Sequence, residues 1–389
     1  MRILLAVHYW LPHLGGVELE ARQQALLLRE RGHQVSVITS RLDGDPEFEL
    51  DEGIEVHRVR ALNTLERRLG LPYPLFDPRV LGVARRLVAE SDVVIGHTHT
   101  FLSTVAAARA AKRLGVPFVL IQNNPYIDYP FPLSLVQKAA DITLGRYSTS
   151  RATRLVAISE FTADYVRRLA PGRPVEVMYL GVDVDRFSPV TPSERRAIRI
   201  RLNLEPDAFI AFTVRRLFFR NGVDTLLEAA ALLRDRTDIR VVIGGSGPDR
   251  AEMDDQIVRD HLDHVTLAGF IPDDDLADYH RAADVFVLPS RTAEGFGLVL
   301  LEAAACSVPS IATRSGAPPE LIDDGETGLL VPTDSPDELA AAIARLADDH
   351  PLAVDMGAAA YARHGDQTWQ RSVDQLEAIL IDAVAEGRG

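Results

Sequence analysis

Short apolar runs alternate along this chain with segments whose apolar positions recur at helical spacing. In the first half the runs are 2–7, 34–40, 54–59, 92–97, 117–121 and 154–159, with helical spacing near 17–31 and 103–114. The second half repeats the alternation with runs at 209–214, 240–245, 264–269, 284–290 and 309–313, and with helical spacing from about 222 to 234 and through Glu302. Apolar runs joined by helical crossovers are typical of buried parallel strands. We therefore expect an α/β protein with two doubly wound units that face each other across a cleft.

The length of the chain favours more than one domain. It has 389 residues, and chains longer than roughly 250–300 residues usually divide into domains. Segment 179–196 contains glycine, aspartates and two prolines and interrupts both periodicities. We predict a first domain over 1–184 and a second over 185–366. Residues 367–389 carry an apolar stripe at helical spacing, which predicts a last helix that packs back on the first domain.

Charge and cysteine usage narrow the class of protein. Forty-two basic against 56 acidic residues give a net charge of −14, which opposes non-specific binding to nucleic acid or anionic lipid. The single cysteine, Cys306, excludes an internal disulfide, and its alanine-rich surroundings favour a buried thiol over a nucleophile. No segment approaches the roughly 18 apolar residues of a membrane span. We expect a cytoplasmic protein with at most a peripheral contact at the inner face of the membrane.

Loops rich in glycine or arginine follow three of the predicted strands. Gly15 and Gly16 come after the first strand, where bare backbone N–H groups can approach a phosphate or form a tight turn. Gly245 lies in IGGSGPDR (243–250), which lacks the full dinucleotide fingerprint, so a nicotinamide cofactor is not expected. The loop VRRLFFRNG (214–222) carries three arginines suited to bidentate phosphate contact: Arg215, Arg216 and Arg220. Because ligands bind at the carboxyl ends of parallel strands, these loops predict an anionic ligand.

The stretch EGFGLVLLE (294–302) places two glutamates eight positions apart, just after a predicted strand. A helix should begin near Gly297 or Leu298, so Glu294 lies in the loop and Glu302 inside the helix. The free N–H groups at such a helix start can hold a diphosphate. The two carboxylates can then accept hydrogen bonds from the sugar and the ribose of a nucleotide sugar. Favourable charge at the helix start explains Glu294 tolerably, but it explains Glu302, which sits among alanines, poorly.

Another acidic run, IPDDDLADY (271–279), raises the question of a metal site. Its adjacent aspartates are Asp273, Asp274 and Asp275. Acidic residues favour the first turn of a helix, and a helix N-terminus explains this run more simply than a metal does. We therefore predict no metal site.

These segments, in this order, resemble the GT-B glycosyltransferases, specifically the retaining glycosyltransferase family 4, or group 1 family. The resemblance covers nearly the whole chain. It rests on LPHLGGVELE near the start, DVVIGHTH (92–99), LVAISEFTADYV (155–166), YLGVDVDRFSP (179–189), VRRLFFRNGVDTLLEA (214–229), VIGGSGP (242–248), LAGFIPDDDLADYHRAADVFVLPS (267–290) and EGFGLVLLEAAACSVPSIAT (294–313).

The resemblance implies roles for particular residues of a donor site. Gly16, beside Gly15, contacts the donor diphosphate from the first domain, which also binds the acceptor. In the second domain Arg216 binds the diphosphate, Glu294 the transferred sugar and Glu302 the ribose. The remaining donor-binding positions are neighbours in the same loops: Arg220, Asn221, Gly245, Gly295, Phe296, Gly297, Leu298 and Val299.

Two departures from the family pattern matter. Asn221 stands where many relatives have lysine, and Arg220 is the candidate substitute for that second cation. The family often has a histidine after the strand at 117–121, where this chain reads IQNNPY. A catalytic role on the acceptor side then falls to His97 or His99, with an ordinary structural histidine as the alternative for each. The polar replacements at the changed position are Asn123 and Asn124.

The implied reaction moves a sugar from a nucleotide-diphosphate donor to an acceptor hydroxyl with retention of configuration. Cations stabilise the departing diphosphate, so neither a metal nor a cofactor is expected. Segments 71–78 and 124–135, together with nearby basic residues, suit a lipid-linked acceptor. A lid over a soluble acceptor such as a glycan explains these segments equally well. The basic residues are Lys138, Arg146, Arg151 and Arg154. The alternative functions are a sugar-nucleotide epimerase, a phosphorylase and a non-catalytic nucleotide-sugar binder. A nucleic-acid partner is not expected.

Overall fold

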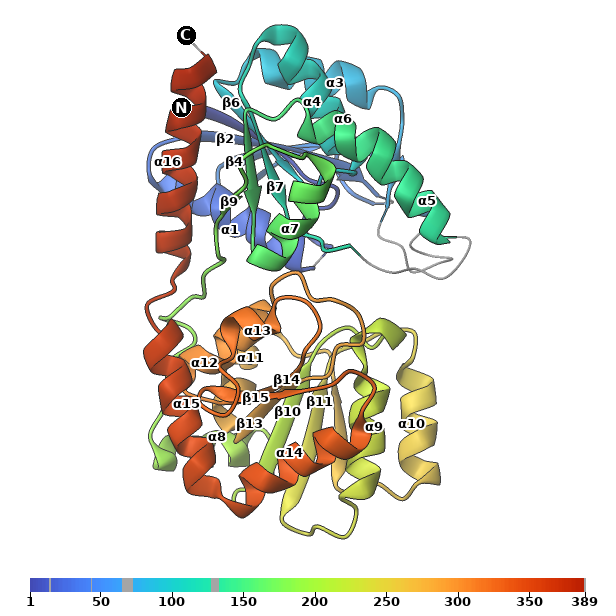
Figure 1. Ribbon diagram of the computed structural model, residues 1–389, viewed down its shortest axis with the longest axis vertical. Helices are drawn as coiled ribbons and strands as arrows, with labels where there is room; N and C mark the ends of the chain where they lie inside the picture. Colours follow the sequence, from blue (N-terminus) through green and yellow to red (C-terminus); the bar gives the residue numbers. More distant parts are fainter. Residues whose placement is uncertain (14, 43, 65–72, 127–132, 388–389) are drawn as a thin grey trace. The chain divides into compact units, whose positions relative to one another are not determined.

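The computed structural model describes residues 1–13, 15–42, 44–64, 73–126 and 133–387. Contacts divide the chain into two compact units (Figure 1). The first unit comprises Met1–Leu180 and Trp369–Gly389, and the second comprises Gly181–Thr368. The sequence places these divisions after residues 184 and 366. The predicted segments 71–78 and 124–135 lie partly outside the described residues.

The first unit is built on one sheet, which has nine strands within the described ranges, with the order β3-β4-β2-β1-β6-β7-β8-β9 and β5 paired to β4. The pairs β3·β4 and β4·β5 are antiparallel and the other pairs are parallel. The strands are β1 (Arg2–Ala6), β2 (Gln34–Arg41), β3 (Phe48–Asp51), β4 (Ile54–Leu62), β5 (Leu75–Phe76), β6 (Val93–His97), β7 (Phe118–Gln122), β8 (Arg154–Ala157) and β9 (Glu176–Val177).

Helices cover both faces of this sheet (Figure 1). They are α1 (Gly16–Glu30), α3 (Val80–Ala89), α4 (Leu102–Leu114), α5 (Leu133–Ala140), the π-helical turn η1 (Asp141–Gly145), α6 (Arg146–Thr149), α7 (Glu160–Leu169) and α16 (Trp369–Gly387). The last of these, α16, contacts α1, β6 and β7. Its Glu377 binds Arg31 and His33, each at 2.8 Å, so the end of the chain belongs to the first unit.

The second unit contains a six-stranded, wholly parallel sheet of order β12-β11-β10-β13-β14-β15. Its strands are β10 (Phe209–Val214), β11 (Ile239–Gly244), β12 (Val265–Gly269), β13 (Val285–Leu288), β14 (Ser310–Thr313) and β15 (Gly328–Val331). Its helices are α8 (Pro192–Arg201), the 3₁₀ turn η2 (Phe219–Asn221), α9 (Val223–Leu232), α10 (Arg250–Arg259), α11 (Asp273–Ala282), α12 (Leu298–Ala305), α13 (Pro318–Leu321), α14 (Pro336–Asp348) and α15 (His350–His364).

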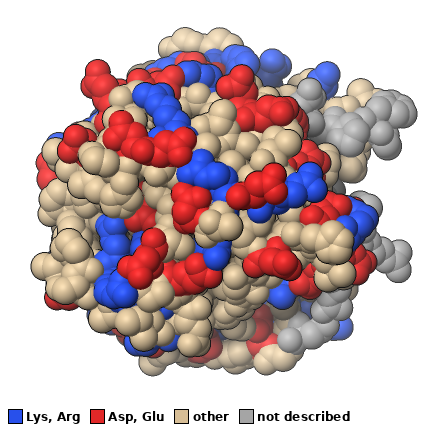
Figure 2. All heavy atoms as spheres, turned by 90° about the horizontal axis from the view of Figure 1, so that it is seen from below, with Lys and Arg blue, Asp and Glu red and all other residues tan. Residues whose placement is uncertain are grey.

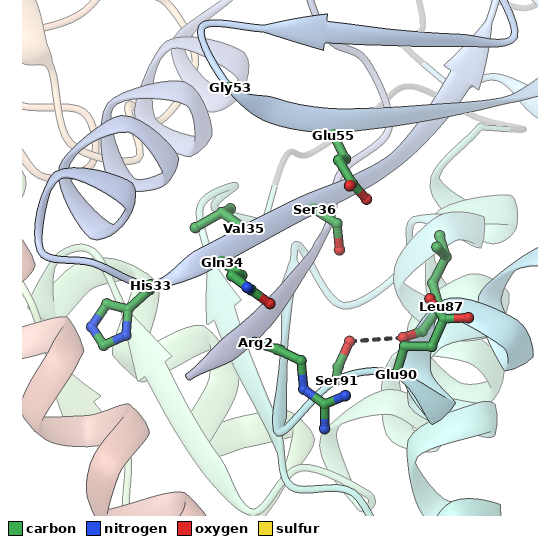
Figure 3. Close-up of a pocket in the computed structure, with 10 residues that line it drawn as sticks. All are labelled: Arg2, His33, Gln34, Val35, Ser36, Gly53, Glu55, Leu87, Glu90 and Ser91. Atoms are coloured by element: carbon green, nitrogen blue, oxygen red, sulfur yellow. Dashed lines mark hydrogen bonds between the residues drawn. The ribbon is translucent and has the colours of Figure 1, made fainter.

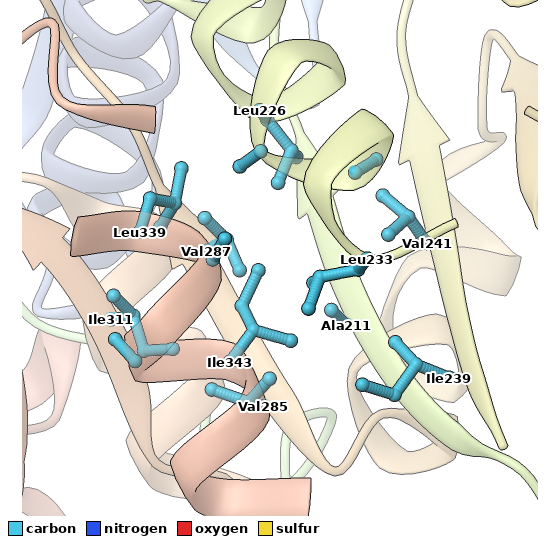
Figure 4. Close-up of a cluster of buried hydrophobic side chains, with 14 of the residues drawn as sticks. Ala211, Leu226, Leu233, Ile239, Val241, Val285, Val287, Ile311, Leu339 and Ile343 are labelled. Carbon is cyan, nitrogen blue, oxygen red and sulfur yellow. The ribbon is translucent and has the colours of Figure 1, made fainter. Parts of the chain in front are cut away.

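Apolar packing between sheet and helices fixes each unit. In the second unit, Leu226 of α9 and Ile343 of α14 pack with Val285 and Val287 of the central strand β13 (Figure 4). In the first unit, side chains of α3 and α4 pack on strand residues such as Leu4 of β1. Fully burying one such aliphatic side chain contributes about 1.5–3 kcal/mol. Helices packed on the faces therefore stabilise both sheets, and the loops at the strand ends can bind ligands.

The apolar runs predicted most of the strands that carry the site. The expected run 209–214 coincides with β10, and the expected helices at 17–31 and 103–114 correspond to α1 and α4. Additional elements were not expected, among them β15 and α8. The expectation of two doubly wound α/β units is confirmed. Each helix in the described ranges is too short or too polar to cross a lipid bilayer.

Candidate functional site

The loops at the carboxyl edge of the second unit's sheet are tied to one another by backbone hydrogen bonds. The loop after β10 bonds to the loop after β11, because Leu217 N donates to Ser246 O at 2.9 Å. It also bonds to the loop after β13, where Arg291 N donates to Arg220 O at 3.1 Å. The three loops therefore form one framework that holds the arginines and Glu294 in fixed positions.

Two glycines allow these loops to approach so closely. Gly222 has φ +68°, and a Cβ added there would lie 1.9 Å from the carbonyl oxygen of Pro289. Gly245 has φ +126°, and a Cβ there would lie 1.9 Å from the carbonyl oxygen of Arg215. Both the left-handed backbone and the missing side chain are needed at these positions. Gly245, predicted as a phosphate-side residue, therefore has a structural role in this turn.

The carboxylate of Glu294 is held by two side chains from neighbouring loops. Arg215 Nη2 donates to Glu294 Oε1 at 2.5 Å, and Ser290 Oγ donates to the same oxygen at 2.6 Å. Burial alone raises the pKa of this carboxyl, but the charge of Arg215, the two hydrogen bonds and the charge of Arg220 together hold the pKa below its usual range. Glu294 is therefore ionised at neutral pH. Since both bonds go to Oε1, Oε2 can accept hydrogen bonds from a ligand.

The backbone of Glu294 is fixed as firmly as its side chain. Its N–H donates to Ser315 O and its carbonyl accepts from Ala317 N, both at 3.0 Å. Gly316 lies between them with φ +91°, and a Cβ there would meet the Glu294 carbonyl oxygen at 2.2 Å. The loop after β14 thus clamps the loop that carries Glu294.

The predicted helix start follows directly. Gly297, with φ +95°, is the N-cap and has no side chain with which to cap the helix. Leu298 and Val299 form the first turn of α12, Gly295 lies in the preceding loop, and Phe296 is 3% exposed. An uncapped helix N-terminus carries free N–H groups and a partial positive charge, which is suited to an anionic ligand.

The three arginines of the loop after β10 differ in their contacts and exposure. Arg215 forms the ion pair with Glu294, and the sequence did not indicate this pairing. Arg216 has an exposed side chain, and Arg220 lies over the ring of Phe218 at 5.3 Å. Asn221 accepts from Arg215 Nη2 at 3.3 Å and donates to Arg216 O at 2.6 Å, so it braces the loop. Its predicted role as a donor ligand and that of Arg220 as a substitute cation stay predictions.

Glu302, in the second turn of α12, is 9% exposed and lies 3.4 Å from His280 Nε2. His280, at the end of α11, is fully buried. Its ring packs against the rings of Phe212 and Phe286, with centroids 5.3 and 5.1 Å away. This histidine therefore lies beside Glu302, although its ring nitrogens and Glu302 Oε2 make no hydrogen bond within the described residues. No sequence pattern indicated it, because its position becomes meaningful only when β10 and β13 lie side by side.

The carboxyl edge of the first unit's sheet holds a buried polar cluster. Glu20, on α1, accepts from Asn123 Nδ2 at 2.5 Å and from Gln24 Nε2 at 2.9 Å. His97, at the end of β6, is fully buried, with Nδ1 4.0 Å from Glu20. Burial raises the pKa of Glu20 to about 8, against the two hydrogen bonds. Burial also lowers the pKa of His97 to about 4, against a bond with Asn123. Both side chains are therefore neutral near pH 7.

His99 is held on both sides within the first unit. Its Nδ1 bonds to Gln122 Oε1 at 2.6 Å and its Nε2 to Asp141 Oδ1 at 3.1 Å, and it is 2% exposed. Asn124, the other predicted polar replacement, accepts from Gln122 Nε2 through its backbone oxygen at 2.5 Å. The burial of His97 and His99 fits the structural alternative, and their acceptor-side role stays a prediction.

Gly15 and Gly16 lie where the sequence expects them, between β1 and α1. Gly15 is the N-cap of α1 in an extended conformation and offers no side-chain cap. Gly16 is the first residue of α1, and within the described residues a Cβ there would meet nothing within 4 Å. The space at Gly16 is therefore open, whereas the carboxylate of Glu18 lies against Gly15, and the contact of Gly16 with a diphosphate stays a prediction.

The other candidates have ordinary roles. Asp273 and Asp275 lie in the first turn of α11, where Arg186 and Arg201 pair with them at 3.2 and 3.0 Å. Across the described residues, no group of three or more His, Cys, Asp or Glu side chains could hold a metal ion. Burial raises the pKa of the Cys306 thiol to about 12, which makes it a poor nucleophile. Figure 2 shows acidic and basic side chains interspersed on one face.

Comparison with known proteins decides the family. Residues 14–186 match the family described as Glycosyltransferase Family 4, and residues 194–363 match Glycosyl transferases group 1. A GDP-mannose-dependent alpha-(1-6)-phosphatidylinositol monomannoside mannosyltransferase of Mycobacterium tuberculosis is 32% identical over 372 residues, covering 92% of each chain. A D-inositol 3-phosphate glycosyltransferase of Saccharomonospora viridis is 33% identical over 408 residues, covering 96% of this chain and 91% of that protein. The chain is a family 4 glycosyltransferase.

The fold comparison agrees with this assignment. A sucrose-phosphate synthase from Thermosynechococcus elongatus superimposes with a TM-score of 0.84 at 23% identity, covering 99% of both chains. The predicted family, fold class and glycosyltransferase activity are confirmed. In this family 4 glycosyltransferase the second unit supplies Glu294, Glu302 and an uncapped helix start at one sheet edge. The roles of the individual site residues stay predictions.

Proposed function

We propose that this glycosyltransferase moves a sugar from a nucleoside diphosphate donor to a hydroxyl of a phosphorylated inositol acceptor, with retention of configuration. The observation that carries the donor site is the ionised carboxylate of Glu294, held by Arg215 and Ser290 immediately before the free start of α12. An anion acceptor and an anion binder so close together suit a ligand that has hydroxyl groups beside a diphosphate.

Each side chain then has a distinct part in the transfer. Oε2 of Glu294 accepts hydrogen bonds from hydroxyls of the sugar that is transferred. Arg216 and the N–H groups of Leu298 and Val299 bind the diphosphate and stabilise the negative charge that grows on it as the glycosidic bond breaks. Glu302, whose Oε2 is buried beside His280 and makes no hydrogen bond within the described residues, accepts from the ribose hydroxyls. We propose that no metal ion takes part, since the charge of Arg216 and the partial positive charge of the helix start do for the leaving group what a divalent metal does elsewhere.

The acceptor class is proposed from what the relatives' names share. One of them acts on phosphatidylinositol monomannoside and the other on D-inositol 3-phosphate. A lipid-borne acceptor is supported by α5 and η1, where Leu135, Val136 and Ile142 are 56%, 63% and 59% exposed. Lys138, on α5, and Arg146, the first residue of α6, are also exposed and can meet anionic headgroups.

The remaining basic residues proposed for acceptor contact are already engaged within the first unit. Arg151 stacks on Tyr147 at 3.4 Å, and Arg154 binds Glu386 at 2.5 Å. We therefore propose a peripheral membrane contact through α5, η1 and the start of α6, with Lys138 and Arg146 as its basic side chains.

The test is turnover with a defined donor and two acceptor arms. GDP-mannose is offered with soluble D-inositol 3-phosphate and, separately, with phosphatidylinositol monomannoside in vesicles, in the presence of EDTA. Product in either arm, with an α-anomeric signal in the NMR spectrum, is the expected result, and the productive arm identifies the acceptor as soluble or lipid-borne. UDP- and ADP-sugars replace GDP-mannose if the first donor fails. Sugar interconversion without acceptor, or turnover that requires added phosphate, would instead indicate an epimerase or a phosphorylase.

A further inference from the structure

A cavity of about 500 Å³ lies at the amino edge of the second unit's sheet, at the opposite ends of the strands from Glu294. Its walls come from α8, from the residues just before β10, β13 and β14, from the end of α12 and from α15. Prolines and alanines form much of the wall. Its charged side chains are Arg195, Arg196, Arg199, Asp207, Asp284 and His350.

Asp284, directly before β13, is shared among several donors in this cavity. Oδ2 accepts from Arg199 Nη2 and from the N–H of Ile210, both at 2.7 Å. Oδ1 lies 3.3 Å from both Arg195 Nη1 and His350 Nε2. One carboxylate therefore faces two guanidinium groups and an imidazole, and its charge cannot balance all three.

Arg195 and Arg199 differ in how they are satisfied. Arg199 is 5% exposed and also donates to the carbonyls of Ala282, Pro206 and Ala208, so it is a structural residue. Arg195 has a side chain that is 24% exposed, and Asp284, 3.3 Å away, is its ion-pair partner among the described residues. Burial lowers the pKa of Arg195 despite the charge of Asp284, which means that the surroundings disfavour its positive charge. An anion beside this side chain would relieve that cost.

The balance of charge in the cavity is positive. Asp207 is paired with Arg196 at the rim. Asp284 is then the carboxylate left for two arginines, and its hydrogen bond raises the pKa of His350, which favours the imidazolium form. We infer that this cavity binds a phosphate group, free or carried on a small organic body, with Arg195 and His350 as its ligands. The volume lies in the range of roughly 300–1,000 Å³ typical of small-molecule sites.

A second cavity provides the contrast. It has a volume of about 480 Å³ and lies at the amino edge of the first unit's sheet (Figure 3). Its arginine, Arg2, is matched by Asp92 at 3.1 Å, while Glu55 and Glu90 line the same cavity. Similar size and position in the fold therefore do not make a phosphate site, because the charge there is acidic.

The test is calorimetric titration of the full chain with inorganic phosphate and, separately, with glucose 6-phosphate. Arg195→Gln should weaken phosphate binding at least about tenfold, because a charge-assisted hydrogen bond is lost. Arg259→Gln is the matched control, since it removes one arginine of the same unit whose partner is its neighbour Asp260 at 3.2 Å. It should leave the affinity unchanged. Tighter binding of glucose 6-phosphate than of phosphate would identify an organic phosphomonoester as the ligand, and equal binding would identify inorganic phosphate.

Two further variants keep this site separate from the proposed donor site. Arg216→Gln removes a cation of the donor site and should leave phosphate binding to the cavity intact. His350→Gln should weaken phosphate binding by a smaller factor than Arg195→Gln, and it preserves the contacts of Asp284 with Arg199 if the arginine variant does not fold. Binding that is unaffected by both cavity variants, or that disappears only in Arg216→Gln, would overturn the inference without touching the proposed transferase reaction.

Discussion

Two glutamates near the carboxyl edges of the two sheets have opposite protonation states at neutral pH, one protonated and the other ionised. Glu20 is buried among amides and an imidazole, and its pKa rises to about 8. The side chain of Glu294 is 23% exposed, and partial burial raises its pKa too, but Arg215 and Ser290 bind it at 2.5 and 2.6 Å and its pKa falls below the usual range. Burial acts in the same direction on both carboxyls. The partner decides the outcome, since an arginine compensates for lost hydration and an amide does not.

The difference in protonation distinguishes a carboxyl group that has a structural role from one that is suited to binding a ligand. A protonated Glu20 completes a neutral network with Asn123 and Gln24, and its two oxygens are already used inside the first unit. In Glu294 both bonds go to Oε1, so its Oε2 can accept a hydrogen bond from a ligand. A polar cluster at a sheet edge is therefore a good candidate for binding when it is both charged and partly unused.

Replacing Arg215 by glutamine should make Glu294 resemble Glu20. The carboxylate would lose its cation, its pKa would rise, and transfer at neutral pH should fall on the order of 100-fold, because an ionised carboxylate left without its partner is costly. The pH–rate profile checks this, since the acid limb of kcat/KM should move to higher pH in Arg215→Gln.

Arg215→Lys provides the control for that experiment. It keeps a positive charge but cannot bridge Ser290 and Glu294 with a planar fork, so part of the activity should return and the acid limb should move back. An unchanged acid limb in Arg215→Gln, with the protein folded, would show that Arg215 does not set the ionisation of Glu294.

The interlocked loops of the second unit should make Gly222→Ala strongly destabilising. The residue has φ +68°, and the new Cβ would lie 1.9 Å from Pro289 O. We expect a loss of about 3 kcal/mol in unfolding free energy, since backbone strain and a backbone clash add together. Urea unfolding followed by circular dichroism measures it.

Gly325→Ala separates the two causes. Gly325 has φ +86°, but a Cβ there would meet nothing within 4 Å in the described part of the chain. Only the strain of about 1–2 kcal/mol should remain. Equal losses in the two variants would mean that the loops part easily, and the rigid framework around Glu294 would then be wrong.

The buried cluster of the first unit predicts a pH dependence that Glu294 does not share. The pKa of Glu20 is raised from 4.5 to about 8, so its contribution to stability is complete below pH 4.5 and is lost as pH rises to 8. The pKa of His97 is lowered from 6.5 to about 4, so its contribution is complete above pH 6.5 and is lost as pH falls to 4. The two effects oppose each other between pH 4.5 and 6.5. Between pH 6.5 and 8 only Glu20 acts, and stability should fall by about 2 kcal/mol.

Tryptophan fluorescence can follow this effect in the first unit, because both tryptophans, Trp10 and Trp369, belong to it. Urea unfolding at pH 6.5 and 8 should show the decline in the wild type and not in Glu20→Gln. Glu294→Gln is the matched control and should keep the decline, because the lowered pKa of Glu294 lies below this window. A decline of equal size in Glu20→Gln would show that Glu20 is ionised in the folded protein.

The sequence predicts the strands and loops of this chain better than it predicts their partners. The run 209–214 coincides with β10 because every residue of that strand is apolar or small. Helix α8 was missed although Thr191 and Glu194 form a readable capping box, because nearby prolines suggested a linker. The pairing of Arg215 with Glu294 joins residues 79 positions apart, and that of Glu20 with Asn123 joins residues 103 apart. Only the order of the strands brings such side chains together, so sequence periodicity cannot show them.

The smallest effect on stability is expected at Gly16. This position of the first unit is uncrowded, whereas the loops at the sheet edge of the second unit pack closely against one another. Gly16→Ala adds a Cβ that meets nothing within 4 Å among the described residues, at the first position of α1. The unfolding free energy should therefore change by less than about 0.5 kcal/mol. If the bare backbone there contacts the donor diphosphate, the same methyl group should raise the KM for the donor about tenfold. If Gly16 instead serves a tight turn, stability should fall and KM should stay constant, so measuring both in one variant separates the two roles.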